Sequence, residues 1–280
     1  MSLFITSLNS GSNGNCYYVS NGNDAVLVDA GISCKETEKR MERLGLSMKS
    51  VKALFISHEH SDHIRGVEVI SKKYQLPVYI TPATLERSRL KIQQQLVCLF
   101  HNQTAISIGN LTVKPFAKRH DAADPYSFVV SGNSINIGVF TDIGFCCENV
   151  IEHFKQCHAV FLEANYDSEM LETGMYPYYL KKRITSGHGH LSNDQSLELF
   201  KTYRSNTLSH LILSHLSREN NSPSLVKKLF EEHAASTQII VASREYETDV
   251  YEIKDPMPAS AALTEERARV YLNHGQQALF

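Results

Sequence analysis

Short apolar runs alternate with polar stretches rich in glycine, asparagine and serine along most of the chain. Runs of β-branched and aromatic residues predict strands. They fall at 4–8, 16–19, 24–29, 52–56, 77–80, 96–99, 104–108, 111–116, 126–131, 134–140, 158–164, 209–214, 238–242 and 248–253. Amphipathic or charged segments predict helices at 33–44, 65–75, 82–95 and 147–154. Strands interleaved with helices indicate an α/β chain.

Capping residues and a change of composition mark boundaries along the chain. Ser33 followed by Glu36, and Ser192 followed by Gln195, have the spacing of a capping box. The composition changes after residue 255. We therefore expect one main domain over residues 1–255 and an appended helical tail over residues 256–280.

Composition narrows the class of protein. With 280 residues, 42% of them hydrophobic, the chain can bury a full core. Its formal net charge is −2, whereas general nucleic-acid binders are usually basic, so any nucleic-acid contact must use a local patch. The six cysteines form no paired framework, the start lacks a signal-peptide pattern, and no apolar run approaches the roughly 18 residues that span a membrane. We expect a cytoplasmic protein with reduced thiols and no membrane partner.

Four metal-capable side chains fall within six positions, directly after the apolar run 54–56. In an extended segment His58 and His60 point the same way, because the strand period is two. Asp62 and His63 then turn toward a second position, and a carboxylate can support another ion. The spacing favours two adjacent metal ions over the alternative of a histidine-rich surface turn.

The order of the remaining acidic and histidine positions extends this pattern. Strands end at Asp29 and Asp142, His120 follows a strand, and a late strand leads into His215. With the H-x-H-x-D-H cluster, this set resembles the metallo-β-lactamase superfamily of metallohydrolases. Residues 10–16, 162–167 and 215–221 resemble its YycJ/WalJ-type branch, which is related to RNase-Z-like phosphodiesterases.

The resemblance implies a four-layer αββα sandwich, with two mixed β-sheets packed together between outer helices. It implies two divalent metal ions, with Zn, Mn and Fe all open. The implied ligands of the first ion are His58, His60 and His120. Those of the second ion are Asp62, His63 and His215, and Asp142 is the implied ligand of both. Asp29 would orient the histidine loop by hydrogen bonds without binding metal.

Polar residues near these positions leave alternatives open. Loop 9–15, which contains Asn15, is either a plain hairpin loop or a loop whose backbone N–H groups face the site and contact phosphate. Glu163 and Asn165 either orient the site or cap the turn that follows them. The basic run 181–183 is either a solvated helix end or a phosphate-binding patch.

Further candidates for catalysis follow from the resemblance. His190 precedes a helix start, where anions are favoured, and by resemblance it contacts the scissile phosphate or protonates the leaving group. His188 is the second choice for that role. Asp62 joins His190 as a catalytic candidate, and Asn220 would order the loop after the last ligand.

The implied activity is that of a dinuclear metal-dependent hydrolase with a metal-bound hydroxide as nucleophile. We expect a phosphodiesterase or nuclease with a nucleic-acid substrate, since the resembled branch is associated with DNA exonuclease activity. The alternative is a thioester or lactone hydrolase of the glyoxalase-II-like type, which shares the histidine motif. A third hypothesis, a metal-binding scaffold, predicts no hydrolysis. The oligomeric state carries no sequence signal.

Overall fold

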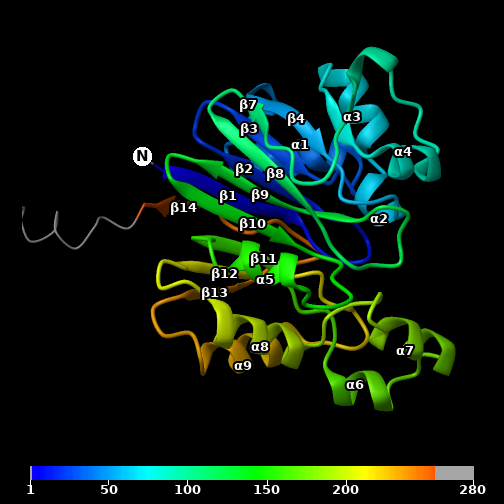
Figure 1. Ribbon diagram of the computed structural model, residues 1–280, viewed down its shortest axis with the longest axis vertical. Coiled ribbons are helices and arrows are strands. Elements are labelled where there is room, and N and C mark those ends of the chain that lie inside the picture. Colours follow the sequence, from blue (N-terminus) through cyan, green and yellow to red (C-terminus); the bar gives the residue numbers. More distant parts are fainter. Residues whose placement is uncertain (1, 256–280) are drawn as a thin grey trace, which may run out of the picture.

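Two seven-stranded β-sheets pack face to face in the computed structural model, which describes residues 2–255 (Figure 1). In order across the first sheet, the strands are β14 (Tyr251–Lys254), β1 (Ser2–Asn9), β2 (Cys16–Ser20), β3 (Ala25–Val28), β4 (Val51–Phe55), β5 (Val78–Ile80) and β6 (Val97–Leu99). Across the second they are β13 (Gln238–Val241), β12 (His210–Ser214), β11 (Ala159–Glu163), β10 (Ile135–Phe140), β9 (Tyr126–Gly132), β8 (Leu111–Ala117) and β7 (Ile106–Ile108). Each sheet mixes parallel and antiparallel pairs.

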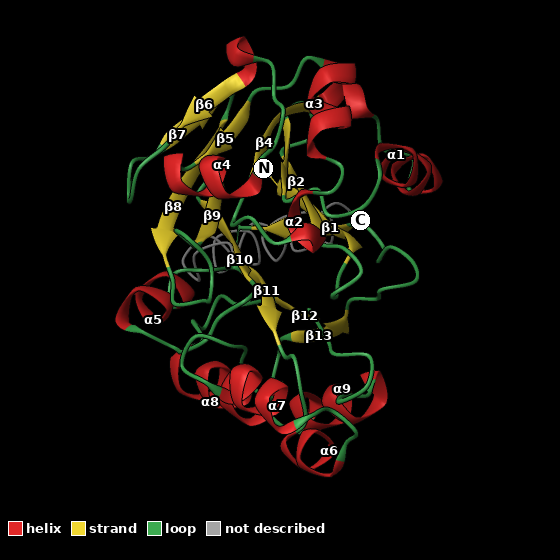
Figure 2. Ribbon diagram, turned by 90° about the vertical axis from the view of Figure 1, so that its right-hand side faces the viewer, coloured by secondary structure: helices red, strands yellow, loops and turns green. Residues whose placement is uncertain are grey.

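Helices cover the outer face of each sheet (Figures 1 and 2). On the side of the first sheet lie α1 (Cys34–Arg43), α2 (Ser61–Ile64), α3 (Val67–Tyr74) and α4 (Pro82–Ser88). On the side of the second lie α5 (Glu148–Phe154), α6 (Ser168–Thr173), α7 (Tyr178–Thr185), α8 (Asn193–Tyr203) and α9 (Pro223–Glu231). Short 3₁₀ turns occupy Met48–Ser50 and Gln94–Leu96. The predicted four-layer sandwich is confirmed, while the expected tail over 256–280 lies outside the described residues.

The central core lies between the two sheets and is made of the inward-facing residues of both. Phe55 of β4, Phe128 of β9 and Phe161 of β11 are fully buried there. The Phe55 and Phe128 ring centroids lie 5.7 Å apart across the layers, and the Phe161 ring lies 4.9 Å from that of Tyr17 in β2. Burying each such side chain contributes about 1.5–3 kcal/mol. Two further apolar clusters join the sheets to their outer helices.

The fold gathers the carboxyl ends of its parallel strands at one edge. Strands β3 and β4 run parallel in the first sheet, and β10, β11 and β12 run parallel in the second. Three of the residues that follow these strands have a left-handed backbone: Asp29 (φ 60°), Asp142 (φ 55°) and His215 (φ 57°). This conformation is disfavoured for residues other than glycine and clusters at functional sites. The chain therefore turns sharply where the candidate ligands lie.

One predicted helix is too long. The charged stretch 82–95 is helical only as far as Ser88, because Arg89 takes a left-handed conformation (φ 56°). Beyond it Leu90 and Ile92 both pack against the outer apolar cluster, and the backbone N–H of Lys91 donates to the Glu68 carboxylate. Alternate residues facing the core favour an extended chain, which overrides the helical propensity of this segment.

The two predicted capping boxes differ. Ser192 and Gln195 form the full reciprocal box at the start of α8. At α1 only half of it forms: the Ser33 hydroxyl accepts from the Glu36 N–H, while the Glu36 carboxylate pairs with Arg40 instead. The last predicted strand, 248–253, forms β14, which begins only at Tyr251.

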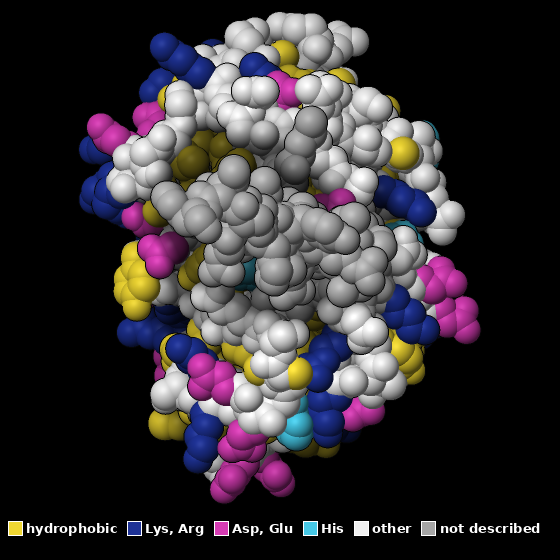
Figure 3. All heavy atoms as spheres, turned by 90° about the vertical axis from the view of Figure 1, so that its left-hand side faces the viewer, with side chains coloured by type: hydrophobic (Ala, Val, Ile, Leu, Met, Phe, Trp, Pro, Cys, Tyr) yellow, Lys and Arg dark blue, Asp and Glu magenta, His cyan; other side chains and the backbone are white. Residues whose placement is uncertain are grey.

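Charge is mixed on the face seen in Figure 3, which is opposite the edge that carries α2 and α7. Wherever described side chains are visible there, lysine and arginine lie among aspartate and glutamate. None of the helices described between residues 2 and 255 combines the length and the apolar character that crossing a membrane requires.

Candidate metal centre

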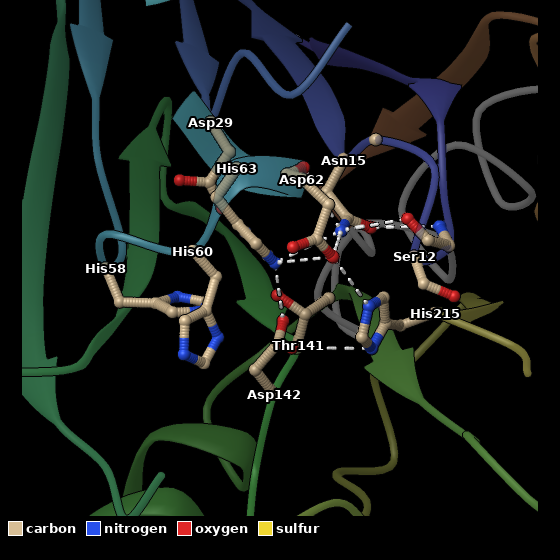
Figure 4. Close-up of polar contacts among 12 residues, drawn as sticks. Ser12, Asn15, Asp29, His58, His60, Asp62, His63, Thr141, Asp142 and His215 are labelled. Carbon is tan, nitrogen blue, oxygen red and sulfur yellow. Dashed lines mark hydrogen bonds and ion pairs between the residues drawn. The ribbon is translucent and has the colours of Figure 1, made fainter. Parts of the chain in front are cut away.

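Three imidazoles converge at the end of β4 and form the first half of the candidate centre. Two of them, His58 and His60, lie side by side in Figure 4. His58 Nε2 lies 3.1 Å from His60 Nδ1, and His120 Nε2 lies 3.3 Å from the same atom. His58 and His60 follow β4, whereas His120 enters from the loop after β8. These nitrogens converge within a space that one ion can fill, and imidazole suits Zn, Fe and related metals.

Hydrogen bonds behind the rings fix which nitrogens are free. The Gly189 carbonyl accepts from His120 Nδ1 at 2.9 Å, so the proton lies on Nδ1 and Nε2 keeps its lone pair. The Ser57 hydroxyl donates to Asp29 at 2.8 Å and accepts from His58 Nδ1 at 2.9 Å. His58 Nε2 is therefore also free. Both rings are positioned as ligands for a cation.

The second half of the centre combines carboxylates with imidazoles. Asp62, His63 and His215 offer atoms that lie within 4.8 Å of one another. His215 Nε2 is 3.4 Å from Asp62 Oδ2, and His63 Nε2 is 3.6 Å from it. Helix α2 carries Asp62 and His63 in its single turn, while His215 ends β12 in the other sheet. The two sheets thus meet through this cluster.

Asp142 lies between the two halves. Its Oδ2 atom is buried and makes no hydrogen bond within residues 2–255, although His63 Nε2 is only 3.1 Å away. Its Oδ1 lies 3.5 Å from His215 Nδ1 and 3.8 Å from His120 Nε2. Lone-pair atoms that face each other without hydrogen-bond geometry fit a cation between them. The donor set is therefore suited to divalent metal.

A buried carboxylate lies behind the histidines in each sheet. In the first sheet Asp29 accepts from the Ser57 N–H at 2.8 Å and from His63 Nδ1 at 2.7 Å. In the second, Glu163 accepts from the Ile143 N–H at 2.7 Å. Because each carboxylate bonds both backbone and ring, it fixes a ligand loop and a ring orientation together.

Glu163 also contacts two histidine rings. Its Oε1 accepts from His190 Nδ1 at 2.7 Å and lies 3.1 Å from His215 Nδ1. Asn165 donates to the His215 carbonyl at 2.7 Å. Of the two alternatives that the sequence left open for Glu163 and Asn165, the geometry favours orientation of the site. Asp167, not these two residues, caps the helix that follows.

Burial and charge set the two halves apart electrostatically. Burial, followed by the charge of His63, lowers the pKa of His58 well below its usual range. Burial likewise lowers the pKa of His120 to about 3. Burial also lowers the pKa of His215, but Asp142, Asp62 and Glu163 outweigh it and raise that pKa to about 10. His58 and His120 in the first half therefore stay neutral, while His215 in the second half holds a ring proton that a cation would displace.

Loop 9–15 reaches this second half through Asn15. The Asn15 side-chain nitrogen lies 3.1 Å from His63 Nε2 and 3.3 Å from Asp62 Oδ2. Its backbone N–H donates to the Asp62 carbonyl at 2.7 Å. An ideal Cβ built on Gly31 would lie 1.7 Å from that carbonyl oxygen. Gly31, in the turn after β3, therefore lies so close to loop 9–15 and to the turn with Asp62 that only glycine fits at this position.

A cavity of about 320 Å³ opens above the centre. The residues that line it are Ser12, His60, Ser61, Asp62, Asp142, Asn165, Tyr176, Leu180, Arg183, Ile184, His190, His215 and Ser217. His190 is among them, whereas His188 is exposed and Asn220 lies behind Ser217, donating to its hydroxyl at 3.4 Å. The Glu163 contact of His190 leaves its Nε2 as the ring nitrogen available to the cavity.

Several residues at the centre were not expected from the sequence. Tyr176, Leu180 and Ile184 enter from α7 and the turn before it. Of the basic run 181–183 that the sequence left open, only Arg183 lines this cavity, and it pairs with Asp121 at 2.5 Å beside His120. Lys118 is buried, and its ammonium donates to the Thr141 carbonyl at 2.5 Å, next to Asp142. The sequence signal for Lys118 was its place two positions before the candidate ligand His120, and a solvated lysine fits that place equally well.

Residues 24–216 match the family described as the beta-lactamase superfamily domain. The chain is 34% identical over 230 residues to exodeoxyribonuclease YycJ of Bacillus anthracis, covering 81% of this chain and 87% of that protein. It is 32% identical over 219 residues to exodeoxyribonuclease WalJ of Streptococcus pneumoniae, covering 76% and 81%.

Solved structures resemble the fold at lower identity. The metallo-β-lactamase fold protein YhfI from Bacillus subtilis superposes with a TM-score of 0.71 at 16% identity, over 90% of this chain and 100% of that one. The short form of human tRNase Z gives 0.59 at 16% identity, over 91% and 100%. These two likenesses concern the architecture.

Proposed function

The chain belongs to the β-lactamase superfamily, and on that premise we propose that it is a metal-dependent exonuclease that hydrolyses phosphodiester bonds of DNA. The observation that carries the proposal is the convergence of two ligand clusters on Asp142, whose Oδ2 has no hydrogen-bond partner among the described residues. The chain that carries this centre is 34% identical to a protein named as an exodeoxyribonuclease. The cavity above this convergence is where a phosphodiester would react.

Two divalent ions, of Zn, Mn or Fe, would occupy the centre under this proposal. His58, His60 and His120 would hold one, Asp62, His63 and His215 the other, and Asp142 would contact both. When bound, the ions supply Lewis acidity that lowers the pKa of water and offsets negative charge on a phosphoryl oxygen. The residues that surround them supply position, orientation and protons.

His190 would serve the leaving group. Its Nδ1 donates to Glu163, and its side chain is 18% exposed at the cavity. The hydrogen bond to the carboxylate fixes the orientation of the ring and leaves Nε2 free for the substrate. A protonated Nε2 can donate to a phosphoryl oxygen or to the departing oxygen, which contributes about 10²–10⁴-fold where a general acid is in place.

Cleavage of bis-p-nitrophenyl phosphate and of end-labelled double-stranded DNA by Mn- and Zn-loaded protein tests the function. We expect both substrates to be cleaved, and EDTA to abolish both reactions. Hydrolysis of a thioester or lactone, with neither phosphodiester cleaved, would replace the nuclease with the glyoxalase-II-like alternative. No hydrolysis of any of them by fully metallated protein would favour a scaffold.

A further inference from the structure

Arg244 lies beside the cavity above the candidate metal centre, which we call the catalytic cavity. No carboxylate among the described residues pairs with its guanidinium. Its Nη2 donates to the hydroxyl of Ser12, a residue that lines the catalytic cavity, at 3.3 Å. Its Nε is buried and has no hydrogen-bond partner among residues 2–255. Arg43 and Arg218 pair with carboxylates, but Arg244 forms no ion pair in the same part of the chain. The side chain as a whole is partly exposed, and a guanidinium with no carboxylate partner and a buried, unbonded Nε favours an anion as its partner.

Hydrogen bonds to loop 9–15 hold the backbone of the segment that carries Arg244. The Ser10 N–H donates to the Ser243 carbonyl at 3.0 Å, and the Asn13 side chain donates to the Arg244 carbonyl at 2.9 Å. The segment after β13 is thereby held against loop 9–15. An ideal Cβ on Gly11, whose φ is 139°, would lie 3.1 Å from Arg244 Nη2. Glycine at that position leaves room for the cation to lie over the loop.

A second cavity, of about 340 Å³, adjoins Arg244. It shares Ser217 with the catalytic cavity, so the two spaces meet at that residue. Leu216, Pro223 and Val241 give it an apolar wall, and Tyr246 at its rim is 66% exposed. A mixture of one cation, hydroxyl groups and an aromatic face suits a nucleotide.

Other charges line the second cavity, and they do not neutralise Arg244. Glu245 lines the cavity and is exposed, and it forms no ion pair with Arg244 in the described structure. Arg218 is also exposed and pairs with Glu219 at 3.6 Å. Arg244 is thus the cation of this cavity that is partly buried, fixed and unpaired among the described residues.

We propose that Arg244 and Ser12 bind the terminal phosphate of a DNA strand, and that the adjoining cavity holds the terminal nucleoside. This inference rests on the nuclease function proposed above. A phosphomonoester matches the fork of guanidinium donors and an adjacent hydroxyl. Because the cavity adjoins the reacting centre, binding a strand end there sets the scissile bond one nucleotide from that end. The subsite would make cleavage exonucleolytic.

Duplexes with a 5′-phosphate, a 3′-phosphate or hydroxyl ends test the subsite with metal-loaded enzyme. We expect wild type to prefer one phosphorylated end, which identifies the end that enters. Arg244→Gln should raise KM for that end roughly tenfold, the scale of one charge-assisted hydrogen bond, with kcat changed less than about twofold. The preference over hydroxyl ends should disappear. Arg244→Lys should restore part of it, which excludes a merely misfolded variant.

Arg43→Gln is the matched control. It removes the same charge from a neighbouring arginine, but Arg43 is paired with Glu247 at 2.6 Å. Its end preference should equal that of wild type. The inference is overturned if wild type does not distinguish phosphorylated from hydroxyl ends, or if Arg244→Gln raises KM equally for all of them.

Calorimetric titration with the 5′- and the 3′-monophosphate of deoxyadenosine separates this inference from the nuclease function. We expect metal-loaded wild type to bind one of the two more tightly, and Arg244→Gln to bind that one about tenfold more weakly. If DNA is not degraded but this difference remains, the phosphate subsite stands and the nuclease function falls. If DNA is degraded but Arg244→Gln binds both monophosphates as wild type does, the subsite falls and the nuclease function stands.

Discussion

The two sheets each place a buried carboxylate behind the histidines of the centre, but the two carboxylates differ in reach. Asp29 bonds one ring, His63, together with the backbone and hydroxyl of Ser57. Glu163 bonds the backbone of Ile143 and contacts two rings, one of which lines the cavity. The first sheet therefore orients candidate ligands only. The second sheet couples a candidate ligand to the group that faces substrate.

This difference follows from where the strands end. Strand β3 has one parallel neighbour, β4, and one antiparallel neighbour, β2, so its terminal carboxylate lies beside only one strand end that leads into candidate ligands. Strand β11 lies between β10 and β12, both parallel to it, so Glu163 lies between two ligand-bearing strand ends. A residue at the end of a central strand can tie together both of its neighbours.

Removing the carboxylate shared by both halves should have the largest effect. We expect Asp142→Ala to lower kcat on DNA by about 10³-fold, a loss on the scale of removing a key electrostatic group. Metal content measured by plasma emission should fall as well, because both clusters lose a ligand. Asp124→Ala, a carboxylate in the loop after His120, is the control and should retain activity. An active, fully metallated Asp142→Ala protein would contradict the ligand assignment.

His190 tests the part of the second sheet that faces substrate. His190→Ala should lower kcat about 10²-fold, the lower range for a general acid, while metal content stays at the wild-type level. His188→Ala, two positions earlier and exposed, should leave kcat unchanged. Equal losses in the two variants would show that the effect comes from the loop and not from the ring.

The comparison itself is tested by Glu163→Gln beside Asp29→Asn. Each should weaken metal binding or activity by roughly 10–100-fold, as for residues that orient metal ligands. Only Glu163→Gln should also lower the kcat of the fully metallated enzyme, because only Glu163 bonds His190. Metal titration and kcat at saturating metal separate the two effects. Equal kcat values of the two variants at saturating metal would remove the distinction between the sheets.

The smallest effect is expected at Glu38, a carboxylate that contacts neither half of the candidate metal centre and serves as the reference for the changes above. Hydrogen bonds from Cys34, Lys73 and Tyr74 lower the pKa of Glu38 to about 2. Its contribution is present above its ordinary pKa of 4.5 and is lost as the pH falls through about 2. Glu38→Gln should cost at most about 1 kcal/mol in urea unfolding near neutral pH, less near pH 3, and leave kcat unchanged. A loss that grows with acidity would reverse the sign.

The layers of the fold were predictable because strand ends carry strong local patterns. The runs before His58, Asp142 and His215 are apolar enough to be read as buried strands, and the order of ligands is carried by the chain itself. The helix over 82–95 was wrong because packing of Leu90 and Ile92 decides the conformation there, and that packing is not local.

The unexpected residues of the centre share a different cause. Lys118 and Arg244 are ordinary basic residues in the sequence, and only tertiary packing brings them close to the cavity. Likewise the double contact of Glu163 depends on three strands being neighbours. Sequence patterns report periods along one segment, so they identify the residues that each strand delivers and not the partners that meet across strands.

The close approach at Gly31 has a consequence for how this protein can vary over generations. Any side chain there would collide with the Asp62 carbonyl, and with it the turn that carries two candidate ligands. No compensating change in a neighbouring side chain can relieve a clash with backbone. In a saturation library selected for DNA degradation, position 31 should therefore accept glycine alone, although its residue has no side chain to contribute to the chemistry.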